Sequence, residues 1–129
     1  MLERFSLEDL VALVERASPS STLTQHAGHV RVACGTIHCD ARVVGSDTGR
    51  QMLSFASSLG ALDLFEDRFP LAKLLACVAT TAHVRAVIEQ GLVVLETRVS
   101  PDDIAPGQLE AAVRWRLATS FPKALETLH

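Results

Sequence analysis

The sequence lacks any hydrophobic run that approaches the roughly 20 apolar residues of a membrane-spanning helix. Its N-terminal stretch, MLERFSLEDL, carries acids early and has no apolar block, so we expect no signal peptide. Cysteine is scarce, and Cys34, Cys39 and Cys77 form an odd set without a repeated spacing. We therefore expect reduced thiols, a cytoplasmic location and no membrane partner.

Signatures of catalysis and of cofactor binding are also missing. The chain has no GxSxG, HExxH, GxGxxG or GxxxxGK motif, and these are arrangements in which nucleophiles, zinc ions, dinucleotides and phosphates are commonly held. It has no internal repeat and no block of like charges. We therefore predict a protein that is not an enzyme and that carries no cofactor.

Basic residues are few and scattered, since 12 Lys and Arg stand against 15 Asp and Glu, for a formal charge of -3. Nucleic-acid binding favours a basic patch, so we expect no nucleic-acid partner. Only Lys73 and Lys123 are lysines, and this bias toward Arg and Ala is typical of a GC-rich bacterial gene. Because 48% of the 129 residues are hydrophobic, we expect residues 1–129 to form one domain with a substantial core.

The clearest structural pattern covers residues 83–99 and predicts a β-hairpin. Two alternating apolar runs, rich in β-branched residues, flank Gln90-Gly91, a two-residue turn in which Gly readily adopts a positive φ. Opposite charges meet at one outer pair, which favours this register. The expected outer pairs are Arg85 with Glu96 and Val87 with Val94, and the expected inward pairs are Glu89 with Leu92, Ile88 with Val93, Ala86 with Leu95 and Val84 with Thr97.

A second hairpin is predicted for residues 29–44, with Gly35-Thr36 as its turn. Arg31 then lies opposite Asp40, which repeats the charge pairing of the later hairpin. On the core face of this hairpin, the expected pairs are Cys34 with Ile37, Val32 with Cys39 and Val30 with Ala41.

A helix is predicted to precede this hairpin, over residues 7–17, with Ser6 and Asp9 capping its start. We interpret the SPSSTLTQHAG stretch that follows as a polar linker. A third strand begins near Gln51, and we interpret residues 57–67 as the tail of this strand and a connecting loop.

Two more helices are predicted in the second half of the chain. One begins near Pro70 and is apolar nearly all round, so we expect it to be covered on more than one side. The last begins near Pro106, and Pro122 should kink or restart it. Its expected inward residues are Leu109, Ala112, Val113 and Leu117, and its expected outward residues are Glu110, Arg114 and Arg116.

The resulting order, α-β-β-β-α-β-β-α, predicts the α+β class, with one antiparallel five-stranded sheet flanked by three helices. This order, and the stretch that begins PLAKLLACVATTAHVRAVIEQGLVVLETRV, resemble the YbjN family, with Gly91, Leu95, Val99 and Pro122 as matching positions. That family is similar in fold to the class I chaperones of type III secretion. The resemblance implies a non-enzymatic protein-binding module, chaperone-like or regulatory, that acts as a homodimer on a protein partner or effector segment.

Two candidate interfaces follow from this interpretation. A dimer or partner interface is expected from the apolar helix and the outer face of the later hairpin, at Leu71, Leu74, Leu75, Val78, Val87 and Val94. An exposed edge strand that accepts a partner strand through backbone hydrogen bonds is expected at Val30, Val32 and Cys34.

The alternative function is a small-molecule or metal sensor that uses a histidine and cysteine cluster in the earlier hairpin. Its members are His26, His29, Cys34, His38 and Cys39. Their spacing matches no common zinc pattern. The hairpin register also sends the two cysteines to the core face and His29 and His38 to the other, so we predict no metal site. For the same reason His38 cannot activate its neighbour Cys39 as a nucleophile.

The Arg114-Trp115-Arg116 run could bind an anion or a peptide. We favour a simpler interpretation, in which Trp115 is the one large anchor of an amphipathic helix.

Overall fold

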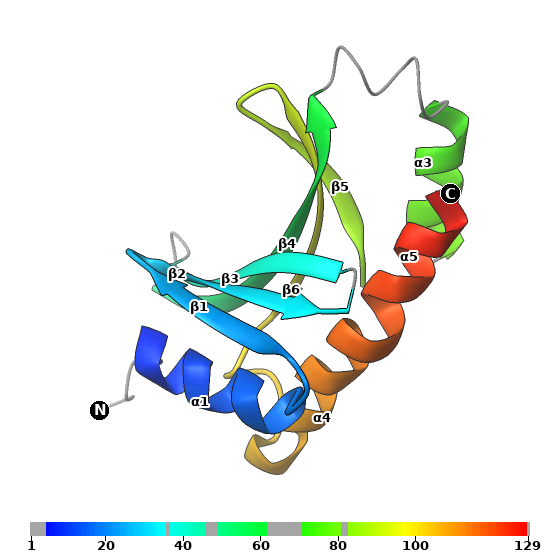
Figure 1. Cartoon of the computed structure of the whole chain (residues 1–129). Coiled ribbons are helices and arrows are strands. Elements are labelled where there is room, and N and C mark those ends of the chain that lie inside the picture. The colour runs from blue at the N-terminus through cyan, green and yellow to red at the C-terminus, as the bar shows by residue number, and fades with distance from the viewer. Residues whose placement is uncertain (1–4, 36, 46–48, 62–70, 81–82, 129) are drawn as a thin grey trace.

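The computed structural model describes residues 5–35, 37–45, 49–61, 71–80 and 83–128, and for residues 60, 61, 71–75, 106, 127 and 128 it describes the backbone alone. Helices and an antiparallel sheet make up this part of the chain, so the predicted α+β class is confirmed (Figure 1). In chain order the elements are α1 (Leu7–Ala17), β1 (Thr22–His26), β2 (His29–Cys34), β3 (Ile37–Gly45), β4 (Gln51–Ala61), α3 (Leu71–Thr80), β5 (Arg85–Glu89), β6 (Leu92–Val99), a 3-10 turn (Pro106–Gln108), α4 (Leu109–Trp115), a π-helical turn (Arg116–Ser120) and α5 (Phe121–Leu128).

The sheet has six strands in the order β1-β2-β3-β4-β6-β5, so the prediction of five strands was wrong. The additional strand is β1, which lies in the stretch interpreted as a polar linker. Ala27-Gly28 joins it to β2 as a tight turn, with Gly28 at a φ of 80°. In β1 only Leu23 is partly buried, and its neighbours are exposed. An edge strand with one buried side chain has no visible hydrophobic alternation, which explains the omission.

The presence of β1 also corrects the predicted edge strand. Val30, Val32 and Cys34 belong to β2, which pairs with β1 on one side and β3 on the other. The backbone groups of β2 are therefore occupied, and the side chains of Val30 and Val32 are buried in the core. The strands at the two edges of the sheet are β1 and β5.

The registers of both predicted hairpins are confirmed. Arg31 pairs with Asp40 in the first hairpin, and Arg85 pairs with Glu96 in the second. The neighbouring pairs recorded in each hairpin also match the expected ones. Gln90 and Gly91 have φ values of 52° and 76°, as a tight two-residue hairpin turn requires. One detail differs, because alternation along β5 and β6 puts Glu89 and Leu92 on the same face as the charge pair.

The capping of α1 is confirmed as well. The Ser6 hydroxyl accepts from the Asp9 backbone N–H at 3.1 Å, and the Asp9 carboxylate accepts from the Ser6 N–H at 2.9 Å. At the other end of α1, Arg114 Nε donates to the Ala17 carbonyl oxygen at 3.3 Å. This contact joins the end of α1 to α4.

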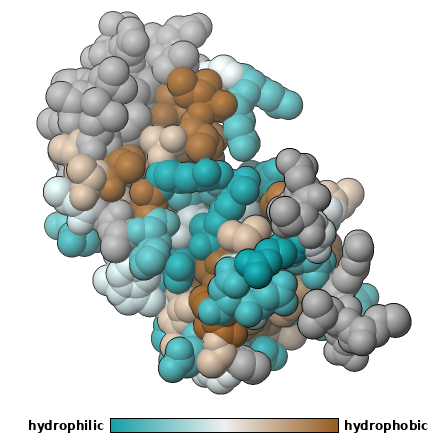
Figure 2. Space-filling model, turned by 180° about the vertical axis from the view of Figure 1, so that it is seen from behind, coloured by the Kyte–Doolittle hydropathy of each residue, from teal (hydrophilic) through white to brown (hydrophobic). Residues whose placement is uncertain are grey.

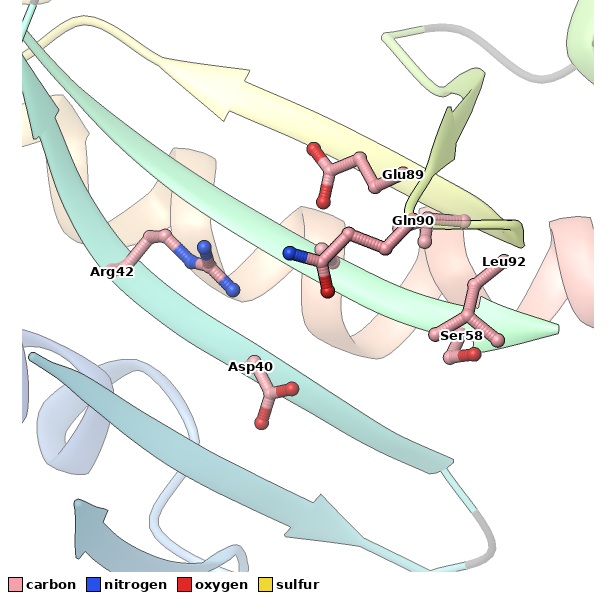
Figure 3. A pocket seen from close by; sticks show the side chains of 8 residues that line it. Asp40, Arg42, Ser58, Glu89, Gln90 and Leu92 are labelled. Atoms are coloured by element: carbon pink, nitrogen blue, oxygen red, sulfur yellow. The ribbon is translucent and has the colours of Figure 1, made fainter. Parts of the chain in front are cut away.

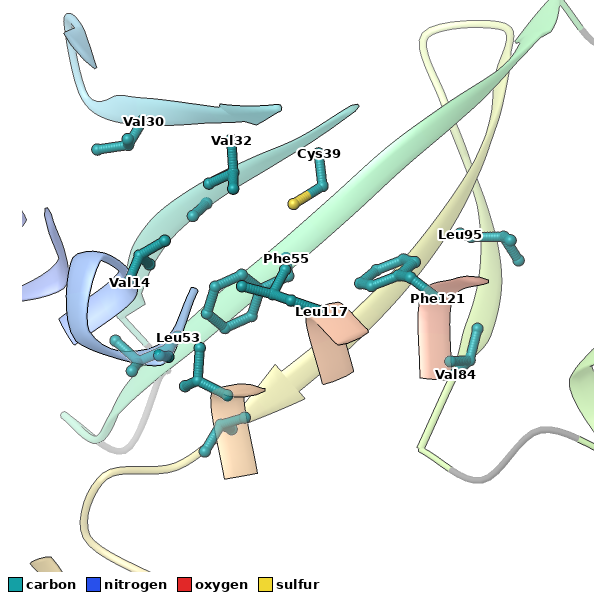
Figure 4. Close-up of a cluster of buried hydrophobic side chains, with 14 of the residues drawn as sticks. Val14, Val30, Val32, Cys39, Leu53, Phe55, Val84, Leu95, Leu117 and Phe121 are labelled. Carbon is teal, nitrogen blue, oxygen red and sulfur yellow. The ribbon is translucent and has the colours of Figure 1, made fainter. Parts of the chain in front are cut away.

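The core lies between the sheet and the helices on one of its faces, where α1, α4 and α5 are packed (Figure 1). Figure 4 shows side chains from both layers meeting in one cluster, which includes Phe55 and Leu53 of β4, Val14 of α1, and Leu117 and Phe121 of the C-terminal helices. Each buried Phe or Leu contributes roughly 1.5–3 kcal/mol through its removal from water. Strand β4 carries two of these anchors at the centre of the sheet.

The interruption predicted at Pro122 appears as the π-helical turn between α4 and α5. There the Phe121 N–H bonds to the Arg116 carbonyl, five residues back. A proline obstructs the ordinary four-residue bond, so a wider turn before it lets the helix continue. The prediction that Arg116 points outward was wrong, because it lies on the same helical face as Val113 and Ser120 and is buried.

The remaining parts of the predicted order agree with the structure as far as it is described. The strand that begins at Gln51 runs to Ala61, and α3 ends at Thr80. Residues 62–67 of the predicted connecting loop, and Pro70 at the predicted helix start, lie outside the described residues.

Candidate functional site

The face of the sheet opposite the core is the candidate site, because no described helix lies across it (Figure 1). Alternation along the strands gives this open face its side chains, among them Arg42 on β3, Ser54 on β4 and Glu96 on β6. Seen from behind, hydrophilic side chains spread over the middle of the molecule, and hydrophobic surface gathers higher up beside the grey atoms (Figure 2).

A buried carboxylate organises the centre of the open face. Glu96 is only 4% exposed. Its Oε1 accepts from Arg85 Nε at 2.8 Å and from Arg98 Nε at 3.1 Å, and its Oε2 accepts from the Ser54 hydroxyl at 2.9 Å. Burial alone raises the pKa of Glu96, but hydrogen bonds from Arg85 and Ser54, with the charges of Arg98 and Arg85, lower it below its ordinary value. Glu96 is therefore an ionised clamp across β4, β6 and β5.

A pocket of about 520 Å³ lies beside this clamp. Figure 3 shows Asp40 and Arg42 on one side of it, from β3, and Glu89 and Gln90 on the other, from the end of the β5–β6 hairpin. Strand β4 runs between them and contributes Ala56 and Ser58, while β6 contributes Leu92 and Val94. The pocket therefore combines charged walls with a partly apolar floor.

The residues of the predicted dimer interface have unequal access to solvent. Val94 is only 7% exposed, whereas Val87 and Val78 are half-buried. Leu71, Leu74 and Leu75 belong to α3, but their side chains lie outside the described part of the structure. Val94 therefore has little surface to offer to a partner.

Among the side chains that the structure describes, the large apolar ones most exposed to solvent lie elsewhere. Ile88 is 62% exposed and Leu92 is 40% exposed, and both flank the turn of the β5–β6 hairpin. Their exposure was not predicted, because both residues were expected on the inward face of the hairpin. The signal that could have found them is their position close to the turn, at the end of the hairpin.

The histidine and cysteine cluster does not converge. His26 and His29 stack at 4.9 Å between ring centroids, and His29 Nε2 lies 3.9 Å from Asp40 Oδ1. Within the described residues, no group of three or more His, Cys, Asp or Glu side chains is placed to hold a metal ion. Burial, then the charges of Asp40 and Cys34, raise the pKa of Cys39 to about 12, so its thiol is protonated at neutral pH.

The Arg114-Trp115-Arg116 run differs from its predicted role. Trp115 is 39% exposed, so the interpretation of this side chain as the buried anchor of the helix was wrong. Its ring meets His83 edge-on at 5.8 Å, and the Arg116 guanidinium lies 6.0 Å from its centroid. Arg116 is the buried member, and its Nε donates to the Thr97 hydroxyl at 3.0 Å. The run thus ties the C-terminal helix to the sheet.

No protein-family model matches the chain, and no curated protein does. In the part of the structure that is described, no helix combines the length and the apolarity that crossing a membrane demands. Among solved structures, the crystal structure of YbjN from E. coli, described as a candidate transcription regulator, is similar, with a TM-score of 0.62. The match covers 95% of this chain and 88% of that chain at 14% sequence identity. This likeness supports the resemblance indicated by the sequence at the level of architecture: the chain has a YbjN-like fold.

Proposed function

We propose that this chain is a non-enzymatic protein-binding module, chaperone-like or regulatory, that works as a homodimer in the cytoplasm. The observation that carries the proposal is the outer edge of β5, which pairs with no described strand other than β6, beside the exposed apolar tip of its hairpin. The likeness to a candidate transcription regulator supports a regulatory role. A negative formal charge of -3 favours a protein partner over a nucleic acid.

The backbone of β5 is arranged to pair with another strand. In a two-residue hairpin the pair next to the turn, here Glu89 and Leu92, exchanges hydrogen bonds, and bonded pairs then alternate. Alternation directs the backbone N–H and C=O groups of Ala86 and Ile88 away from β6, toward the free edge. Such an edge is a template for strand addition.

The sequence of β5, RAVIE, is self-complementary for pairing with a second copy. An antiparallel pair centred on Val87 sets Arg85 of one copy opposite Glu89 of the other, on both sides of the two-fold axis. It also sets Ala86 opposite Ile88, so the outward backbone groups of these residues bond to each other. Opposite charges directly across a strand pair stabilise that register.

This dimer retains part of the predicted apolar interface. Val87 lies at the proposed axis, and α3 leads directly into β5 and contacts it. We propose that α3 extends the interface beyond the strand pair, through Leu71, Leu74, Leu75 and Val78. Val94 supports Val87 from the neighbouring strand.

Sedimentation equilibrium of the purified chain tests the dimer. Ile88→Pro removes one outward N–H and leaves the bonds between β5 and β6, as a proline on an edge strand can. The matched control is Gln25→Pro, because alternation in the β1–β2 hairpin also directs Gln25 to a free edge. We expect a dimer for the unaltered chain and for Gln25→Pro, and a monomer for Ile88→Pro. If Ile88→Pro is still a dimer, the dimer interface does not lie at β5. If the unaltered chain is a monomer, the proposed homodimer is refuted.

The β1 edge is then the proposed site for a partner segment, since β5 is used by the dimer. The test places a photo-crosslinking residue at Gln25 and, as a control, at Glu126 on the exposed face of α5. The proposal is supported by a protein that crosslinks to the probe at position 25 and not to the probe at position 126. A peptide with the sequence of its crosslinked segment should then bind the unaltered chain and not Gln25→Pro. A segment that binds both equally refutes the use of this edge.

A further inference from the structure

The outer edge of β5 accepts a second copy of itself in more than one register. The backbone groups of Ala86 and Ile88 point outward from this edge. Three two-fold pairings connect such outward groups, and they are centred on Ala86, on Val87 or on Ile88. Moving the centre by one residue moves the two strands by two, so every side chain stays on its own face of the sheet. Backbone hydrogen bonds alone therefore do not select one register.

An incomplete charge cluster lies beside this edge. Arg85 and Arg98 share the single carboxylate of Glu96, and within the described residues none of the three has another ion-pair partner. The cluster therefore has two positive charges for one negative charge. Arg85 donates to Glu96 through Nε and Nη2, which leaves its Nη1 without a partner among the described residues. The Arg85 side chain is 54% exposed, so a second carboxylate has access to it.

Glu89 carries a carboxylate that the described fold does not use. Within the described residues it forms no ion pair and no side-chain hydrogen bond, and it is exposed. It lies on the same face of β5 as Arg85, four residues along the strand. In the pairing centred on Val87, Arg85 lies directly opposite the partner's Glu89. In the other two registers, Arg85 faces the partner's Val87 or the partner's Gly91.

The pairing centred on Val87 brings the charges close together. Its hydrogen-bonded pairs join Ala86 to the partner's Ile88, so Arg85 and the partner's Glu89 form a non-hydrogen-bonded pair. In such pairs the Cα atoms are about 4.5 Å apart and the side chains approach most closely. Arg85 then has a carboxylate on each side, from Glu96 on β6 and from the partner. The two-fold axis repeats this contact, so both clusters become neutral.

We propose that Arg85 and Glu89 set the register of the dimer, because the cluster of Arg85, Glu96 and Arg98 takes its missing carboxylate from the partner's Glu89. This inference rests on the β5 dimer of the proposed function and adds what selects a second copy of this chain at that edge. A strand without an acid at the matching position can add to β5 through its backbone, but it leaves the cluster one negative charge short.

Disulfide crosslinking at position 87 tests the register. In the proposed pairing, the Cα atoms of Val87 and of the partner's Val87 are about 4.5 Å apart, which a disulfide spans. In the other two registers these residues are diagonal neighbours at about 7–8 Å, which is too far. Val87→Cys is combined with Cys34→Ser, because the other native thiols are buried, and the protein is oxidised with diamide. We expect a covalent dimer linked through position 87.

Substitutions of Glu89 in this background test the charge. Crosslinking rates are measured at a protein concentration at which less than half of the chains are dimeric. Two cross-strand charge pairs per dimer predict that Glu89→Gln crosslinks roughly 2- to 30-fold more slowly, and Glu89→Lys, which repels Arg85, more slowly still. Salt at about 0.5 M should slow the parent and leave Glu89→Gln nearly unchanged. The control is Glu126→Gln on the exposed face of α5, which should crosslink at the parent's rate.

The possible results separate this inference from the dimer itself. If the unaltered chain sediments as a monomer, both are overturned. If the unaltered chain is a dimer that Ile88→Pro dissociates, but no crosslink forms through position 87, the dimer at β5 stands and the proposed register is wrong. If Glu89→Gln crosslinks as fast as the parent, the charge does not set the register and the inference is overturned. Glu89 is exposed, so unchanged circular dichroism will show that its variants fold.

Discussion

Replacing Glu96 with Gln should lower the free energy of unfolding by about 2 kcal/mol at neutral pH. The carboxylate is buried and accepts hydrogen bonds from Arg85, Arg98 and Ser54. An amide of the same size keeps the bond to Ser54 but loses the attraction to both guanidinium groups. The variant therefore removes the negative charge at position 96 and keeps the size of the side chain.

The magnitude follows from the exposure of the partners. A hydrogen bond to a charged group contributes about 1.5–3 kcal/mol, and breaking a fully buried ion pair costs about 3–5 kcal/mol. Here the side chains of Arg85 and Arg98 are 54% and 37% exposed, so water solvates them once the carboxylate is removed. Exposed pairs contribute only about 0–1 kcal/mol, which brings the expected loss down to about 2 kcal/mol.

The pH dependence has a definite sign. The pKa of Glu96 in the folded chain lies below its ordinary value of 4.5. Its contribution to stability is therefore complete above the unfolded pKa and disappears as the pH falls through the folded pKa. The difference between the unaltered chain and Glu96→Gln should narrow between about pH 7 and about pH 3.

Urea denaturation followed by circular dichroism, at both pH values, measures this difference. The control is Glu126→Gln on the exposed face of α5, which should change the free energy of unfolding by less than about 0.5 kcal/mol at either pH. The reasoning is refuted if Glu96→Gln is as stable as the unaltered chain at neutral pH, or if its deficit is the same at low pH.

Two further predictions concern the core. During alkylation by iodoacetamide near neutral pH, Cys34 should react in the folded chain, whereas Cys39 should react only after denaturation, because it is buried and its pKa is about 12. Peptide mass mapping measures the alkylation rates of both thiols. Equal rates in the folded chain would contradict the burial of Cys39. Phe121→Ala should cost about 3–5 kcal/mol of unfolding free energy, since Phe121 is fully buried at the start of α5. The exposed Thr119→Ala is its control, and similar urea midpoints for the two variants would show that Phe121 is not a core anchor.

Sequence reasoning succeeded where pairing is local. In both predicted hairpins, two residues separate the strands, so alternation and one charge pair are enough to set the register. The Ser54–Glu96 bond joins β4 to β6, which are separated in sequence by α3. No local pattern reports that two such strands are neighbours, so the clamp around Glu96 was only half predicted. The same limit hid the pocket, whose walls come from β3 and β5.

The errors have different physical causes. Strand β1 is held by hydrogen-bonded pairing with β2 rather than by burial of its side chains, so its own residues show almost no hydrophobic pattern. Arg116 was placed outward on its charge alone, although its helical position is on the core face. There Thr97 and the Ala112 carbonyl satisfy two of its nitrogens, at 3.0 Å each. Buried polar partners of this kind cannot be identified from the sequence, because they meet only when the helix packs on the sheet.

The β5–β6 hairpin has two ends with different physical characters, and this allows binding to be separated from folding. At its base, Arg85 and Glu96 hold β5 on the sheet through a charge pair whose carboxylate is buried. At its tip, Ile88 and Leu92 are exposed, so changing them removes little apolar surface from the core. Substitutions at the tip should therefore change the proposed dimer at nearly constant stability, while substitutions at the base should change stability first. A single hairpin can in this way supply a fixed edge and a variable contact surface.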